Sequence, residues 1–441
     1  MFADVKGPSF IFWPVGTGDT TTIVVSNTEV VQIDINDKQM ADDEGNEHIP
    51  IVDELVAQLP KKDGKPYLSC FILTHPDLDH CRGFADLLSR VTIGEIWHTP
   101  RVFREYEDEC ELSDDAIAFR KEAHRRAVRC VKIGGDPGAG DRVRIVGYSD
   151  LFEPGARYEG FPQHEYYTRP GQSVTMLDGI DAHNRFHVFV HAPFKQGLAD
   201  ARNETSLAMR VTIGSIDNNM KGLFLGDLSY PTLMQVFEET HAHDNEDMLD
   251  WNVLLSPHHC SKKVMYEDNV LRDDVMQEFS DSQLSPGYVV ASSNEFPHSN
   301  STGDNPPHRK ARNRYEEIVN NEFLCTGEVS TPKQVQPIIF SVTVNGIELF
   351  IEDYELSESA ETTLSAALAR VRGNKATPAN KVGFGAECRP GRSNKSRRSP
   401  TLQGDRSKCS ILWNRARMVQ PCTSPFQSTA NAFHESTVGC L

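Results

Sequence analysis

Several features of secreted and membrane proteins are missing from this sequence. No apolar run approaches the roughly 18 residues that a membrane-spanning helix needs, so we expect no membrane association. The chain starts with MFADVK and lacks a basic segment followed by an apolar stretch, which argues against a signal peptide. None of the ten cysteines forms a Cys-x-x-Cys pair. These absences predict reduced thiols and a cytoplasmic location.

The sequence also lacks internal repeats with a period of roughly 20–50 residues, which excludes solenoid and propeller arrays. Its 441 residues, 38% hydrophobic and 24% charged, have the composition of a globular protein with one large domain or two modest ones. Apolar stretches of strand length alternate with segments of helical periodicity. A two-residue hairpin signal, Asn345-Gly346, joins the last two strands. The pattern predicts a mixed α/β fold, with strands at 10–13, 22–25, 30–34, 71–73, 91–97, 187–190, 206–213, 222–227, 250–256, 288–292, 337–344 and 347–352, and helices at 51–59, 84–88, 114–131 and 231–239.

Charge is distributed unevenly along the chain. Residues 374–441 contain 11 Lys and Arg against three acidic residues, so this part carries +8 and the rest carries −26 of the total of −18. An acidic body does not attract nucleic acid by its general field. Beyond an Ala-rich helix expected at 356–372, the chain is polar, and its four cysteines lack the paired spacing of a zinc module.

We therefore expect a folded domain at 1–355 and a low-complexity basic tail at 356–441. The favoured interpretation of the tail is a disordered extension without a function of its own, because it lacks the apolar periodicity that would offset its ordering entropy. A basic arm that binds nucleic acid is the alternative interpretation.

Metal-ligating side chains are concentrated directly after the apolar strand at 71–73. Four of them, His75, Asp77, Asp79 and His80, lie within six residues. In an extended segment alternate residues share one side, so the first three converge, and His80 joins them as the chain turns. Two imidazoles and two carboxylates in so short a loop predict a site for one or two divalent cations.

Further short motifs follow one another along the chain. They are VGTGD at 15–19 with Ile33-Asp34, THPDLDH at 74–80, NETS at 203–206, LGD at 225–227, HHCS at 258–261 and Pro307-His308. In this order they resemble the motifs of metallo-β-lactamase-fold hydrolases, most closely the ComEC-type branch. The resemblance covers residues 10–352 and implies a four-layer αββα sandwich.

The resemblance also implies a ligand set for two divalent metal ions, Zn or Mn. Asp227 would bridge the two ions, although a structural Asp that caps the following helix is the alternative. Of the adjacent histidines, His258 aligns with the family ligand, and His259 would contact substrate or be structural. The implied metal ligands are His75, Asp77, Asp79, His80, Asp227 and His258.

Four positions keep two interpretations each. Asp34 either orients a ligating histidine or is an ordinary Asp at a strand end. The place of a third histidine found in other branches is taken by Asn203 or by His191, and His191 is equally well a core residue. His308 either contacts a phosphate or leaving group, or belongs to a plain loop.

Two residues depart from the branch pattern. Arg82 stands where a small Gly is usual, and Cys260 replaces the Gly of the His-His-Gly-Ser motif. Either change would alter the wall of the site, and Cys260 beside the metals would be able to ligate or be oxidised. The membrane channel that gives the branch its name is absent, so the name says little about the substrate.

These patterns predict metal-dependent hydrolysis, with a phosphodiester of a nucleic acid or nucleotide as the leading substrate. Asp79 and Asp227 would orient the attacking hydroxide, and His308 or Arg82 would assist the oxyanion or leaving group. The alternatives are an ester, lactone or thioester hydrolase, and a metal-stabilised binding or regulatory module that acts with a protein partner. No signal in the sequence fixes an oligomeric state.

Overall fold

The structure is a computed structural model that describes residues 2, 5–38, 49–103, 112–195, 203–300, 303–329 and 336–351. The chain divides into two compact units, Met1–Pro390 and Gly391–Leu441, and every described residue belongs to the first. The expected helix at 356–372 and the basic tail lie outside the described residues.

The first of two large sheets has ten strands among the described residues and is built from both ends of that part of the chain. Strands β3, β6, β7, β8 and β9 run parallel, whereas the neighbours of β1 and β2 are antiparallel. The strand order is β22 (Gly346–Phe350), β21 (Ile338–Thr343), β1 (Ser9–Phe12), β2 (Thr21–Ser26), β3 (Glu29–Ile33), β6 (Lys65–Ile72), β7 (Thr92–His98), β8 (Arg142–Val146) and β9 (Tyr167–Thr168), with β5 (Lys61–Lys62) paired to β6.

The second sheet combines an antiparallel half with a parallel half. Its order is β10 (Ser173–Val174), β13 (Phe186–Ala192), β14 (Ala208–Gly214), β15 (Asn219–Phe224), β16 (Trp251–Leu255), β19 (Gln283–Ala291) and β20 (Glu322–Cys325). Two small hairpins pair β11 (Met176–Leu177) with β12 (Ile180–Asp181), and β17 (Tyr266–Glu267) with β18 (Val270–Leu271).

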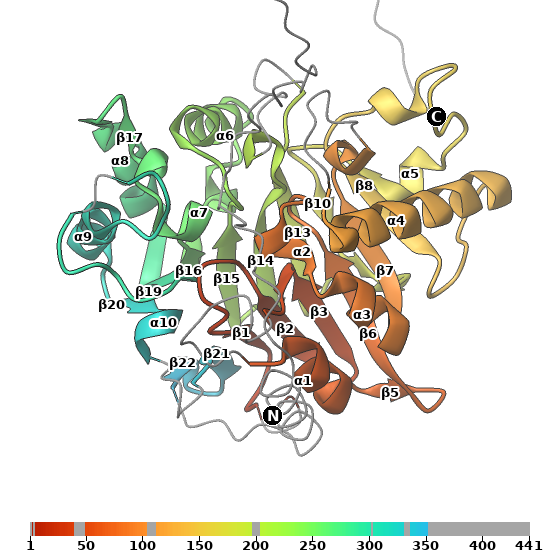
Figure 1. Ribbon diagram of the computed structural model, residues 1–441, viewed down its shortest axis with the longest axis horizontal. Coiled ribbons are helices and arrows are strands. Elements are labelled where there is room, and N and C mark those ends of the chain that lie inside the picture. Colours follow the sequence, from red (N-terminus) through yellow and green to blue (C-terminus); the bar gives the residue numbers. More distant parts are fainter. Residues whose placement is uncertain are drawn as a thin grey trace, which may run out of the picture. The chain divides into compact units, whose positions relative to one another are not determined.

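Helices lie on the outer faces of both sheets (Figure 1). Those over the first sheet are α1 (Ile51–Gln58), α3 (Phe84–Arg90) and α4 (Asp114–Ile133), and those over the second are α6 (Tyr230–Ala242), α8 (Asp273–Asp281) and α9 (Arg309–Ile318). Shorter elements are β4 (Ile35–Asn36), α2 (Leu78–Cys81), α5 (Gln163–Tyr166), α7 (Pro257–Cys260) and α10 (Thr326–Val329).

Three apolar clusters hold these layers together. Between the sheets, Phe12 of the first packs on Phe224 of the second with ring centroids 6.3 Å apart. On the outer side of the first sheet, the rings of Phe71, Phe84 and Phe119 join β6, α3 and α4. A third cluster joins the second sheet to α6, α8 and α9. Burial of apolar faces on both sides of each sheet is the main source of stability in this arrangement.

The mixed α/β class expected from the sequence is confirmed. The hairpin at the end forms, but its two loop residues are Val344 and Asn345, because Thr343 pairs with Gly346. The charged helix α4 is more than a surface element, since its small side chains Ala116, Ala123 and Ala127 are buried against the first sheet. The structure also contains strands β8, β9 and β20 and helices α8 and α9, which the sequence pattern did not predict.

No helix in the described part of the chain is long and apolar enough to cross a membrane.

The direction of the parallel strands determines where the candidate site lies. Strands β3, β6, β7 and β8 end at one edge of the first sheet, and the segments after β15 and β16 meet the same edge. This edge is where open α/β sheets carry their ligand sites, and the candidate site lies there.

Candidate metal centre

The loop after β6 is held in an extended form before it turns. Leu73 N donates to Trp97 O of β7 (3.0 Å), which keeps the chain in line with the sheet beyond Ile72. Asp77 is the N-cap of the four-residue helix α2, and His80 N donates to Asp77 O (3.0 Å). The sequence expectation of a strand that ends in a tight polar turn is met.

A second segment reaches the same place from the loop between β1 and β2. Asp19 N donates to Asp79 O (3.1 Å) and fastens this loop to α2. Gly18, at φ +148°, leaves no room for a side chain, since a Cβ there would lie 2.8 Å from Asp79 O and 2.1 Å from Asn36 Nδ2. Glycine in the VGTGD segment therefore allows Asp19 to approach the α2 turn.

The third contributor is Asp227, which follows β15 after a glycine with positive φ. A Cβ on Gly226 would lie 2.7 Å from Ser206 Cβ. The Ser206 hydroxyl donates to Asn203 O (2.7 Å) and accepts from Asp227 N (3.4 Å). The NETS segment thus holds the backbone that presents Asp227, and Asn203 takes part through its carbonyl.

The fourth contributor is an unusual turn at α7. His258 (φ 51°, ψ 48°), His259 (φ 52°, ψ 40°) and Cys260 (φ 63°) are three successive residues in the left-handed region. Non-glycine residues rarely adopt it, at about 1–3 kcal/mol each. The turn is held by His258 N, which donates to Gly226 O (3.0 Å), and by His308 N, which donates to Cys260 O (3.1 Å). Strain of this kind is typical of functional sites.

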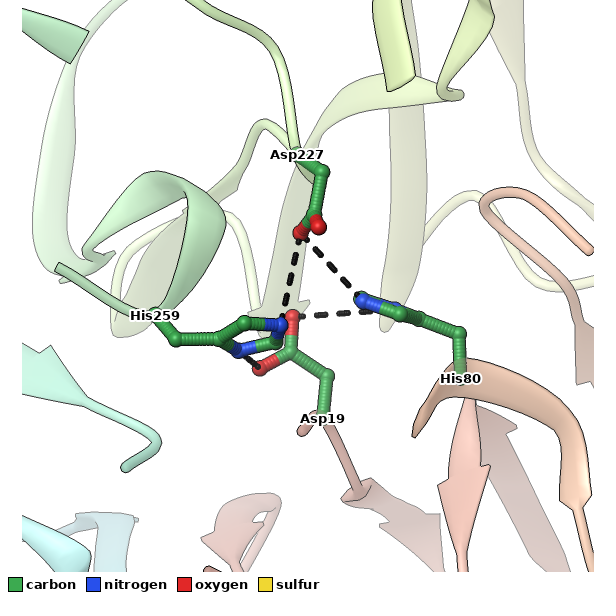
Figure 2. Close-up of side chains that lie close together, drawn as sticks. All are labelled: Asp19, His80, Asp227 and His259. Carbon is green, nitrogen blue, oxygen red and sulfur yellow. Dashed lines mark ion pairs between the residues drawn. The ribbon is translucent and has the colours of Figure 1, made fainter. Parts of the chain in front are cut away.

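Four buried side chains from these four segments form the cluster shown in Figure 2, where they point toward one another. Each offers one ligand atom, and these atoms all lie within 4.8 Å of one another. The four are Asp19, His80, Asp227 and His259, all 5% exposed or less.

More ligand-type atoms surround Asp227, and they fall into two groups. Near its Oδ1 lie His80 Nε2 (3.3 Å) and His259 Nε2 (3.6 Å), and His259 Nε2 is 3.3 Å from Asp79 Oδ2. We call these side chains, with Asp227, the inner group. A cation with four ligands at about 2.0–2.1 Å separates them by about 3.3 Å, so the spacing suits one tetrahedral ion.

The outer group lies near the other carboxylate oxygen of Asp227. His75 Nε2 and His258 Nε2 are each 3.7 Å from Asp227 Oδ2, and His75 Nε2 is 4.0 Å from Asp77 Oδ2. These distances are slightly longer than those of the inner group. Asp227 thus presents one oxygen to each group.

Buried carboxylates stand behind both imidazoles of the inner group. Asp34 Oδ2 is 2.7 Å from His80 Nδ1, and its carboxylate also accepts from Thr74 N (2.8 Å) and Thr74 Oγ1 (2.6 Å). Asp19 Oδ1 is 3.3 Å from His259 Nδ1. A carboxylate at Nδ1 fixes the ring so that Nε2 faces the metal position, as in many histidine metal sites.

Charges in the cluster perturb one another strongly. Burial acts to lower the pKa of His80, but Asp227 and Asp34 outweigh it and raise that pKa well above its usual value. Burial also acts to lower the pKa of His259, but the carboxylates of Asp227 and Asp19 outweigh it and raise that pKa to about 10. Burial and the neighbouring His80 hold the pKa of His75 well below its usual value. Burial also lowers the pKa of His258.

The carboxylates respond in the opposite sense. Burial alone would raise the pKa of Asp227, but the surrounding imidazoles, with His258 and His259 the strongest, hold it well below its usual value. The pKa of Asp79 is likewise lowered, against burial, by its contact with His259. Asp227 and Asp79 therefore stay ionised, and in the absence of a metal protons on His80 and His259 balance them.

Several of these buried atoms have no hydrogen bond of acceptable geometry. They include the Nε2 atoms of His75, His80 and His259 and Oδ1 of Asp227. A buried polar group without a partner costs about 1–3 kcal/mol, and four in one place call for an explanation. Imidazole nitrogens and carboxylate oxygens that converge without hydrogen bonds fit a divalent cation such as Zn²⁺ or Mn²⁺.

The six side chains expected to ligate metal all lie in the two groups. His75, Asp77 and His258 are in the outer group, His80 and Asp79 are in the inner group, and Asp227 belongs to both. Their role as ligands stays a prediction.

Two members of the cluster were not expected as ligands. His259, assigned to substrate or structure, lies in the inner group, because the left-handed turn lets both adjacent histidines face Asp227. Asp19 lies in the VGTGD segment recognised in the sequence. It is far from His80 along the chain, so the sequence gives no sign that the two side chains meet. The signal that does exist is Gly18, which allows a close approach to the backbone of Asp79.

Other candidates are placed elsewhere. His191 bonds to Thr240 Oγ1 through Nδ1 (3.1 Å) and to Met248 O through Nε2 (3.0 Å), so it is a core histidine behind α6. His308 accepts from Lys262 N at Nδ1 (3.1 Å) and donates from Nε2 to Gly303 O (3.0 Å). Both ring nitrogens of His308 are thereby occupied, and a role at the leaving group would need one of them to be released.

Of the two departures from the branch pattern, Cys260 does not form the wall of the cluster as expected. Cys260 is fully buried among the residues between the second sheet and its helices, and burial raises the pKa of its thiol well above the usual value. A thiol of this kind is unreactive. The backbone of Arg82 pairs with Asn36, and its carbonyl accepts from Asp37 N (3.0 Å).

Comparison with known proteins adds no identification. No family model and no curated protein sequence matches this chain.

Proposed function

We propose that the protein is a metal-dependent hydrolase with two divalent cations at this cluster, Zn or Mn, and that its substrate is a phosphodiester. The observation that carries the proposal is the position of Asp227, whose two oxygens face two separate groups of nitrogen and oxygen atoms. This layout suits a carboxylate that bridges two cations. We further propose that the two sheets with outer helices are a metallo-β-lactamase-like αββα sandwich, which the order of the sequence motifs supports.

Exposure of the side chains indicates where a substrate would enter. Asp77, Asp79 and His258 have side chains 18%, 16% and 14% exposed, whereas the remaining members of the cluster are at most 8% exposed. The cluster is therefore open where Asp77, Asp79 and His258 lie and closed behind His80 and His259. A substrate would approach over Asp77 and His258.

Each set of residues then has a task. Two cations would supply an activated hydroxide near neutral pH and neutralise charge on phosphoryl oxygens. Asp34 holds the imidazole of His80 in one orientation through a hydrogen bond, and Asp19 lies 3.3 Å from Nδ1 of His259, so the site needs little rearrangement during the reaction. Asp79, at the open side, would accept and pass on the proton of the attacking water.

A wild-type measurement tests the proposal. Metal content of the purified full-length protein should be close to two divalent ions per chain by mass spectrometry, and bis-p-nitrophenyl phosphate should be hydrolysed faster than an ester or a lactone. Faster turnover of the ester or lactone would move the protein to the second hydrolase class. Metal without turnover of any of the three would favour the binding or regulatory module.

The matched pair His80→Ala and His191→Ala separates a metal role from general damage, because both histidines are buried and hydrogen-bonded. His80→Ala should lose metal and at least about 10³-fold of the activity, consistent with the loss of a group essential to a metal site. His191→Ala should lower stability and keep the metal. Full activity in metal-free protein would contradict the proposal.

A further inference from the structure

Four basic residues lie in two segments that are bonded to the α7 turn of the metal centre. Lys262 and Lys263 lie in the short helix η6 (Lys262–Val264), directly after the α7 turn, and Arg309 and Lys310 begin α9. His308 joins the two segments, since its ring accepts from Lys262 N (3.1 Å) and its own N donates to Cys260 O (3.1 Å). The four cations are thus tied to the turn that presents His258 and His259.

These cations differ in how far they are neutralised. Lys262 is satisfied, with Nζ 2.7 Å from Gly303 O and 3.1 Å from Asp304 Oδ1. Lys310 Nζ lies 3.8 Å from the centroid of the Tyr266 ring. Among the described residues, no ion pair involves Lys263, which is exposed, or Arg309, which is partly exposed.

The positive charges of Lys263 and Arg309 have no ion-pair partner among the described residues. The first turn of α9 contains no acidic residue. A helix N-terminus carries partial positive charge, so Arg309 and Lys310 in this turn are unfavourable for the helix itself. Apart from the tail, the chain carries −26, which makes a local cluster of unpaired cations the exception. An anion bound at this place would satisfy both the side chains and the helix.

We propose that Lys263, Arg309 and Lys310 bind the backbone phosphates of a nucleic-acid strand next to the bond that is cleaved. The inference rests on the proposed phosphodiesterase function and adds the surface and the polymeric nature of the substrate. Phosphate contacts by Lys and Arg position a nucleic acid without reading its sequence. A polymer extends past Asp77 and His258 onto this surface, whereas a small phosphodiester occupies the metal centre alone.

The test uses the full chain and a nuclease-resistant phosphorothioate oligonucleotide, with binding followed by fluorescence anisotropy at increasing salt. The variant is Lys263→Glu/Arg309→Glu. Its control, Lys61→Glu/Lys65→Glu, makes the same charge change on exposed residues of the β5–β6 hairpin, away from α7 and α9 (Figure 1). The basic tail is present in all three proteins, so its contribution to binding is the same in each of them.

We expect the first variant to bind at least tenfold more weakly than wild type, and its slope of log affinity against log salt to be smaller by about one to two. The control variant should bind within about threefold of wild type. Turnover of bis-p-nitrophenyl phosphate should be unchanged in both. If charge reversal lowers the yield of folded protein, Lys263→Gln/Arg309→Gln should show the same effect with a smaller amplitude.

Equal binding by Lys263→Glu/Arg309→Glu and wild type would overturn the inference. Equally effective competition by poly-glutamate would overturn it in favour of an acidic protein partner. A binding difference without hydrolysis of any phosphodiester would leave this surface in place and refute the proposed function. Phosphodiester hydrolysis without a binding difference would refute only this inference.

Discussion

Two buried clusters of charged residues lie in this molecule, and they are satisfied in different ways. The first is the candidate metal centre. The second lies around Glu95 and Asp178 on the far part of the first sheet. There, Glu95 accepts from Trp97 Nε1 (2.7 Å) and lies 3.3 Å from Arg144 Nε, while Asp178 accepts from Arg142 (2.7 Å) and from Tyr67.

The second cluster has its own cations, so its carboxylates are paired within the protein. The metal centre has five carboxylates and four imidazoles, and the carboxylates of Asp19, Asp34, Asp79 and Asp227 form their ion pairs with these imidazoles. Buried charge needs a partner, and here the partners of the carboxylates are imidazoles, which carry a charge only when protonated. Burial of charge alone does not distinguish a site from a structural network, but imidazoles in place of guanidinium groups, with ring nitrogens that lack hydrogen bonds, do.

The largest expected effect is a contrast between one substitution in each of the two clusters. Asp227→Asn should lose bound metal and at least about 10³-fold of the activity, because both groups share this carboxylate. Asp178→Asn should lower the free energy of unfolding by about 1–3 kcal/mol, because it removes the buried carboxylate that accepts from Arg142 and Tyr67, while Arg142 keeps its pair with Asp136.

Metal content, turnover of bis-p-nitrophenyl phosphate and urea unfolding of both variants check this contrast. Asp178→Asn should keep its metal and, when folded, wild-type turnover. Loss of metal from Asp178→Asn together with retention in Asp227→Asn would reverse the assignment of the two clusters.

The second expectation concerns pH and applies to the metal-free protein. The pKa of His259 is raised to about 10 by Asp227 and Asp19 against burial, and its unfolded value is about 6.5. Its contribution to stability is therefore complete below pH 6.5 and is lost as the pH rises through about 10. We expect the free energy of unfolding to fall by a few kcal/mol over this range.

Urea unfolding of chelated protein between pH 6.5 and 10 measures this fall. Asp19→Asn and Asp227→Asn should each flatten the curve. Bound metal should also flatten it, since metal binding requires a neutral imidazole and releases the proton. A stability that rises with pH in chelated protein would show that His259 is not held protonated.

A third expectation compares the inner and outer groups. The outer group contains Asp77, a hard oxygen donor, so Mn²⁺ should support activity at least as well as Zn²⁺. Asp77→His should shift the ratio of Zn²⁺ to Mn²⁺ activity by about tenfold towards Zn²⁺.

Reconstitution of chelated protein with each metal gives the ratio. Asp86→His, on the exposed surface of α3, is a matched control and should leave it unchanged. An unchanged ratio in Asp77→His would show that ligand hardness at this position does not set the preference.

The smallest expected effect concerns the left-handed turn. Cys260→Gly relieves the strain of a non-glycine residue at φ 63°, worth about 1 kcal/mol, but removes a fully buried side chain of similar value. We expect a net change in the free energy of unfolding within about 1 kcal/mol, with metal content unchanged. Cys260→Ala keeps the strain and should be the less stable of the two variants by urea unfolding.

The sequence by itself determined the local features. The apolar run followed by a His- and Asp-rich turn predicted the strand and the loop, because strand period and turn chemistry act over a few residues. It also brought together His75, Asp77, Asp79 and His80, which are neighbours in any fold of that loop. The alternation of strands and helices was sufficient for the mixed α/β class.

Only the tertiary structure decided which distant residues complete the cluster. Asp19 and His259 meet because the two sheets place the β1–β2 loop and the α7 turn at one edge. Backbone contacts between residues far apart in the sequence then bring Asp19 Oδ1 within 3.3 Å of His259 Nδ1. It also decided between equal candidates, since packing behind α6 occupies both ring nitrogens of His191. Short-range order follows from residue type and spacing, whereas the partner of a buried charge depends on how the layers pack.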